Sequence, residues 1–210
     1  MTDAEVRRTV PAWIWGGALL AASAVAPSAL TMVAPGGGPV ARVVISALFA
    51  ASLVVFAFGV RGQGSIVDRR PGGVIALMVL AFVPPLIDLV TPATVAEDQV
   101  ASLTVVSYVQ LAIAAAAALA AVVAIGRADA VPHPWRWAPA WGLAVIVVIS
   151  VTPQIIGVAL QGRAVDEFLW LFSLGSLAML AVPLALGILA MLLGARGLAA
   201  PSPQIYPPAA

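Results

Sequence analysis

Apolar residues fall into six blocks along the chain, and short polar or Gly/Pro-rich segments separate the blocks. They cover about residues 12–33, 40–60, 72–91, 100–125, 137–160 and 168–193. A bilayer core about 30 Å thick needs roughly 20 helical residues, and every block reaches that length. The pattern predicts an all-α, polytopic integral membrane protein whose six transmembrane helices form three hairpins.

The division of the chain follows from these blocks. Residues 12–196 are expected to form the transmembrane domain, and residues 1–11 a short cytoplasmic segment in front of it. Residues 197–210 are rich in proline and are expected to form a mobile cytoplasmic tail. The connections are too short to bury a core, so no separate soluble domain is expected.

Composition narrows the classes of function. The chain is 62% hydrophobic and 9% charged, its net charge is +1, and it has one histidine and no cysteine. The charge balance gives no reason to expect nucleic acid as a partner, and the absence of cysteine removes disulfides and thiolate metal sites. The sequence also contains no lysine, which excludes a retinal Schiff base and a P-loop. We therefore expect no enzymatic activity, no cofactor and no metal ion.

Arginine placement predicts the orientation in the membrane. Eight of the ten arginines lie in the N-terminal segment, in the connections after the second and fourth blocks and, as Arg196, just before the tail. The other two lie toward the opposite side: Arg42 is near the start of the second block, and Arg163 is in the connection after the fifth. Cytoplasmic segments carry the excess of positive residues. The sequence therefore predicts a multi-pass protein of the cell membrane with both termini in the cytoplasm.

A glycine and a proline recur eleven residues apart in the first, third and fifth blocks. The pairs are Gly16 and Pro27, Gly73 and Pro84, and Gly142 and Pro153. One interpretation is a repeated hairpin, either as three hairpins with pseudo-threefold symmetry or as two related hairpins and a diverged one. The other is coincidence in a chain rich in Gly, Pro and Ala, and the sequence leaves both open.

Asp88 is the one carboxylate inside a predicted transmembrane segment, and it follows the pair Pro84 and Pro85. A charged group in lipid is costly, so Asp88 is expected to be near water, protonated or paired. One hypothesis is a proton or cation site where the prolines free backbone carbonyls. The alternative is an interfacial side chain that helps to end the helix.

Polar residues in the fourth and fifth blocks are further candidates for a transport path. They are Thr104, Ser107, Tyr108 and Gln154. The first three share one helical face. Hydrogen bonds between helices explain the same residues equally well.

Tryptophans near the predicted membrane surface are expected to anchor the chain. Trp13 and Trp15 lie at the start of the first block, and Trp135, Trp137 and Trp141 surround the start of the fifth. Two functions remain open: a small-solute or ion transporter with proline-broken helices, and a non-catalytic membrane subunit or scaffold. The expected partners are the lipid bilayer and either another membrane protein or further copies of this chain.

Overall fold

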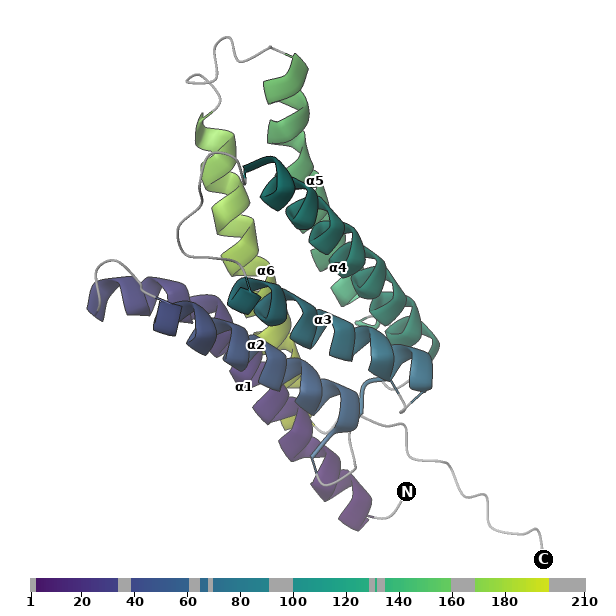
Figure 1. Cartoon of the computed structure of the whole chain (residues 1–210). Helices are drawn as coiled ribbons and strands as arrows, with labels where there is room; N and C mark the ends of the chain where they lie inside the picture. Colours follow the sequence, from purple (N-terminus) through teal and green to yellow (C-terminus); the bar gives the residue numbers. More distant parts are fainter. Residues whose placement is uncertain are drawn as a thin grey trace, which may run out of the picture.

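The computed structural model is all-α and describes residues 3–33, 39–60, 65–67, 70–90, 100–128, 131, 135–159 and 169–196. Its six helices are α1 (Asp3–Val33), α2 (Pro39–Phe58), α3 (Pro71–Val90), α4 (Val100–Ala128), α5 (Ala138–Ala159) and α6 (Leu169–Ala195). The six helices predicted from the apolar blocks are confirmed (Figure 1). The predicted mobile tail lies outside the described residues.

Most helix ends fall within two or three residues of the block boundaries, but α1 is longer than expected. It begins at Asp3 instead of residue 12 and continues through Pro11 and Pro27 to Val33. Its first turns are polar, so they could not be recognised by hydropathy. The polar N-terminal segment is therefore largely helical.

Within the described residues, four helices are long and apolar enough to cross a membrane, with candidate spans at Ala12–Leu30, Ala41–Phe58, Tyr108–Ala128 and Ser173–Ala195. In α3 and α5 the apolar stretches found among the described residues are Pro71–Ile87 and Ala138–Ile149, below the length of the other four. The protein is thus a multi-pass helical membrane protein with four candidate spans. The crossing of the membrane by α3 and α5 remains a prediction.

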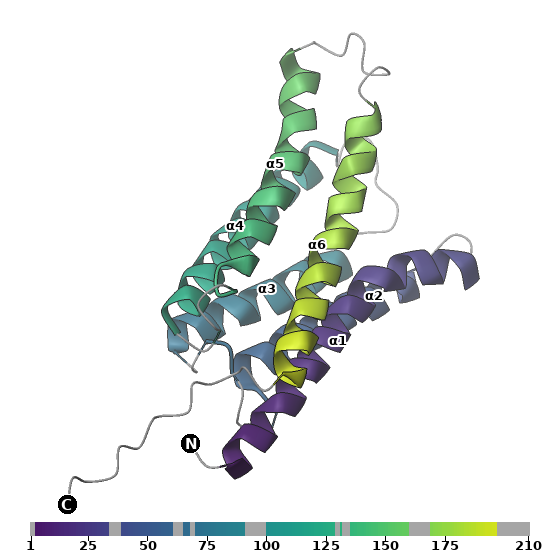
Figure 2. The same cartoon turned by 180° about the vertical axis from the view of Figure 1, so that it is seen from behind.

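The helices pack as a ring that is weakly closed on one side. Each helix packs along its hairpin partner, α2 packs along α3, and α1 makes extensive contact with α6, so the first and last helices lie together. Contact between α4 and α5 is slight by comparison. Figures 1 and 2 show the two faces of this arrangement.

The α1–α6 crossing depends on two glycines that face each other. A Cβ atom at Gly17 would lie 2.5 Å from the carbonyl oxygen of Gly187, and one at Gly187 would lie 2.6 Å from the carbonyl oxygen of Gly17. Only a hydrogen at both positions allows the two backbones to touch. Small residues have this role in membranes, where apolar burial gives helices little drive to associate.

Three other glycines permit close packing inside the hairpins. A Cβ at Gly16 would lie 2.8 Å from the ring of Phe56 in α2, one at Gly73 would lie 2.9 Å from Ala124 in α4, and one at Gly142 would lie 2.7 Å from Val182 in α6. These are the glycines of the eleven-residue pattern, and each faces the second helix of its own hairpin. Close packing explains the glycines whether or not the hairpins are repeats.

The C-terminal end of α2 is closed by the chain that follows it. Gly59 has a φ of 72°, which suits glycine, and its N–H donates to the carbonyl of Val55 at 2.7 Å. The hydroxyl of Ser65 donates to the carbonyl of Ala57 at 2.6 Å, and the N–H of Ile66 donates to that of Phe56 at 3.0 Å. These bonds satisfy backbone groups that the helix end leaves open.

Candidate functional site

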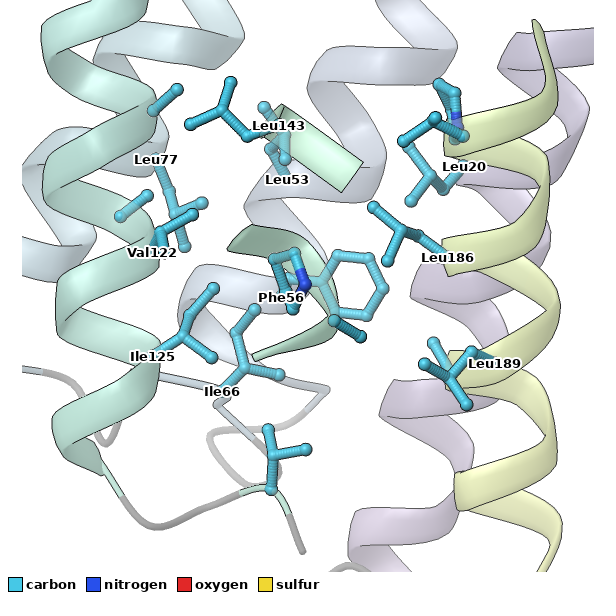
Figure 3. Close-up of a pocket in the computed structure, with 18 of the residues that line it drawn as sticks. Leu20, Leu53, Phe56, Ile66, Leu77, Val122, Ile125, Leu143, Leu186 and Leu189 are labelled. Atoms are coloured by element: carbon cyan, nitrogen blue, oxygen red, sulfur yellow. The ribbon is translucent and has the colours of Figure 1, made fainter. Parts of the chain in front are cut away.

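A cavity of about 350 Å³ lies in the centre of the helix ring (Figure 3). All six helices contribute to its wall, and Ile66, Val131 and Trp135 contribute from the connecting segments. Its volume falls within the range of small-molecule sites in proteins, about 300–1,000 Å³. The cavity is the candidate binding site.

The cavity lies toward one end of the bundle. Its lining residues come from the first halves of α3 and α5, from the first two thirds of α1, from the second halves of α2 and α4, and from the middle and second half of α6. We call this the N-terminal end of the bundle, since α1, α3 and α5 begin there and α2, α4 and α6 end there. It is the end that arginine placement predicts to face the cytoplasm.

Apolar side chains dominate the lining. Leucine, isoleucine, valine, alanine, phenylalanine, tryptophan and proline account for every described lining residue, including Leu53, Leu77, Leu143 and Leu186 (Figure 3). None of the described lining side chains carries a charge. Such a surface attracts the apolar part of a ligand and gives an ion nothing to coordinate it.

Two packed clusters border the cavity, and α5 belongs to neither. One joins α2, α3 and α4 through residues such as Ala57, Ala81 and Ile125; the other joins α1, α2 and α6 through Trp13 and Leu193, among others. No residue of α5 is buried among those whose side chains are described. Because local stability follows buried contacts, α5 is the least firmly held part of the wall.

Tryptophan and arginine side chains gather beside α4 and α5 at the N-terminal end. Trp135 lines the cavity, and the guanidinium of the next residue, Arg136, lies 5.9 Å from the ring centre of Trp137. That same ring is 3.1 Å from the position of a Cβ at Gly126, and so joins the end of α4 to the start of α5. Arg127, the next residue in α4, is exposed. The region combines cationic groups with an apolar interior.

Trp13 differs from the expected surface anchor. It is only 4% exposed and lines the cavity, whereas Trp15 is 62% exposed. Residues two apart on a helix point in different directions, so only one of the two faces outward. Trp135, Trp137 and Trp141 are exposed, as an interfacial role requires.

The residues predicted as a transport or cation site lie in three helices. Pro84, Pro85 and Asp88 are in α3, Thr104, Ser107 and Tyr108 in α4, and Gln154 in α5. Tyr108 is 64% exposed. Of the other six, only Pro85 has a described side chain, and it is half-buried. None of the seven is among the described lining residues, so their joint role stays a prediction.

Several hydroxyls in the helices bond to the backbone of their own helix. Ser23 donates to the carbonyl of Leu20 at 2.7 Å, Ser52 to that of Phe49 at 2.7 Å, and Thr152 to that of Val148 at 2.6 Å. Ser23 and Ser52 are buried. These bonds satisfy the hydroxyls without a partner helix or a ligand.

The apolar site was not recognised from the sequence, because its residues are of the same types as those that face lipid.

Within the described part of the chain, no group of three or more His, Asp or Glu residues lies together as a metal site would require.

Comparison of the chain with protein-family models, curated proteins and solved structures gives no match. The fold and composition identify a multi-pass helical membrane protein with an apolar cavity inside its ring of helices.

Proposed function

We propose that this protein is a membrane transporter of small solutes and that its cavity binds the alkyl part of an amphiphilic solute. The observation that carries the proposal is the apolar cavity of about 350 Å³ surrounded by all six helices. The proposal includes no catalytic activity.

Slight contact between α4 and α5 supports a route into the cavity. Both helices contribute lining residues, including Val122 from α4 and Ile146 from α5. Separating them breaks few contacts, and α5 has no buried residue among its described side chains. In the proposal, α5 moves away from α4 and opens the cavity sideways to the lipid. Pro183 lines the cavity and interrupts the backbone hydrogen bonds of α6. In the proposal, α6 bends at this proline and so provides a second place where the cavity wall can move.

Transport can be tested with permanently charged amphiphiles, which cross a bilayer slowly without help. Proteoliposomes and protein-free liposomes are given dodecyl sulfonate or dodecyltrimethylammonium at concentrations that do not dissolve membranes, and entry is measured. We expect the protein to accelerate entry of at least one. Ala118→Trp and Leu143→Trp, which fill the cavity from α4 and α5, should remove the acceleration.

Ala120→Trp is the matched control, because Ala120 is exposed on α4 and is not among the lining residues. It should transport normally. Equal entry with and without the protein would contradict the proposal, as would equal loss in the control and in both cavity variants. Circular dichroism and gel filtration establish that each variant is folded.

A non-catalytic membrane subunit is the second candidate, and the same weak α4–α5 contact favours it. A transmembrane helix of a partner protein would then complete the ring. The chain lacks cysteine, so a cysteine introduced at Val147, exposed on α5, can carry a single photo-cross-linker. A specific protein adduct in native membranes supports this role, and adducts with lipid alone contradict it.

A further inference from the structure

We infer that the solute is a single-chain anionic amphiphile, with its alkyl chain in the cavity and its anionic group beside Arg127 and Arg136. The inference rests on the proposed transport function and adds the chemical class of the solute. Its elements are the cavity size, the position of the two arginines, and the charge asymmetry of the protein.

The cavity has room for one alkyl chain. At about 350 Å³ the cavity is at the small end of the range for sites that hold drug-sized ligands, about 300–1,000 Å³. A single alkyl chain is a ligand of that size, whereas a phospholipid carries two chains of membrane length. A solute with one chain is therefore favoured over a phospholipid.

The two arginines lie where α4 ends and α5 begins, beside the weakly closed side of the ring. Arg127 follows the lining residue Ile125 by two positions and is exposed on another face of α4, and Arg136 follows the lining residue Trp135 directly. A chain that enters between α4 and α5 at this end leaves its polar group at the same end of the bundle as both arginines. The Arg136 guanidinium lies over the ring of Trp137, and this cation–π contact favours a positive charge at that position.

The distribution of charged residues between the two ends of the bundle also favours an anionic ligand. The segments at the N-terminal end of the bundle carry eight arginines and four carboxylates, a net charge of +4. The segments at the other end, with Asp88, carry two arginines and five carboxylates, a net charge of −3. An anionic group is attracted to the end where the cavity lies, and a cationic group is repelled from it.

Binding is measured by equilibrium dialysis of the protein in nanodiscs of zwitterionic lipid. The probes are dodecyl sulfonate, dodecyltrimethylammonium and dodecanol, which share one chain and differ in charge. We expect saturable binding of the sulfonate, at least about tenfold tighter than that of the cation. The sulfonate can form a charge-assisted contact with the arginines, whereas the trimethylammonium group cannot.

The arginine pair is tested by the double variant Arg127→Gln and Arg136→Gln. Sulfonate affinity should fall about tenfold, the effect of losing such a contact, while dodecanol affinity stays the same. Arg127→Lys with Arg136→Lys should keep most of the preference for the anion. Arg42→Gln is the matched control, because Arg42 is exposed on α2 toward the other end of the bundle.

The outcomes separate this inference from the function on which it rests. Saturable binding of all three probes with equal affinity, or an equal loss in Arg42→Gln, overturns the anionic assignment and leaves the apolar cavity in place. Saturable binding of none contradicts the proposed function itself. Anionic phospholipid in the nanodiscs should displace little sulfonate beyond its effect on surface charge, and full displacement would overturn the single-chain assignment.

Discussion

Replacing Gly187 by alanine tests the crossing of α1 and α6. The new Cβ would lie 2.6 Å from the carbonyl oxygen of Gly17 and 2.8 Å from the backbone nitrogen of Ala21. Ordinary contacts begin at 3.4 Å, so the atoms must separate by about 0.8 Å. Both neighbouring atoms belong to the α1 backbone, and rotation of a side chain cannot relieve the clash. The two helices must move apart.

The cost can be estimated from the interface that opens. A radial gap of about 0.5–1 Å loses a quarter to a half of the energy of a van der Waals contact. The contacts affected are those of the apolar cluster beside this crossing, which includes Trp13, Leu20, Ala190 and Leu193. Overpacking of this kind typically costs about 1–3 kcal/mol. Gly187→Ala should lower the free energy of unfolding by that amount, and Gly187→Leu by more.

The measurement is an unfolding titration with sodium dodecyl sulfate in mixed micelles, followed by circular dichroism. Gly175→Ala is the matched control: it lies in the same helix, and a Cβ there meets nothing within 4 Å. It should leave stability unchanged or raise it by about 0.5–1 kcal/mol through helix propensity. Equal stability of Gly187→Ala and Gly175→Ala would refute the close crossing.

Three further changes have defined outcomes. Gly59→Ala should cost about 1–2 kcal/mol, because φ is 72° there, whereas Gly72→Ala, with open space around its Cβ position, should cost little in the same titration. Ser65→Ala should cost about 0.5–1.5 kcal/mol by removing the hydrogen bond to the carbonyl of Ala57, and Ser65→Thr should retain part of it. If Asp88 forms a proton or cation site, Asp88→Asn should remove proton-coupled flux in proteoliposomes; unchanged flux dismisses the carboxylate.

The sequence predicted the helices well, because the length of an apolar block and the Gly/Pro content of its ends are set by the membrane and by backbone geometry. The start of α1 was missed, because its first turns are as polar as a loop. The order of helices in the ring was not predicted. Helices that are apolar on every side do not reveal which face meets a neighbour.

The same uniformity hid the cavity. Leu53 and Leu186 line the cavity, whereas Leu177 and Leu192 are exposed on the outside of α6. All four are leucines, so residue type alone does not distinguish the cavity lining from the lipid-facing surface. Glycine was the more informative residue type. The eleven-residue pattern contains Gly16, Gly73 and Gly142, and all three are sites of close packing. It does not contain Gly17, which faces Gly187 directly.

The presence of an alkyl chain inside the ring is tested most directly through Trp13. Two variants retain one tryptophan each, Trp13 (4% exposed, in the cavity lining) or Trp15 (62% exposed), with phenylalanine at the other positions. Dodecyl sulfonate brominated along its chain is added to both in nanodiscs, and tryptophan fluorescence is recorded. Quenching of Trp13 should saturate at one probe per protein, while that of Trp15 should rise steadily as the probe enters the lipid. No quenching of Trp13, or the same unsaturated rise at both positions, would contradict an occupied central cavity.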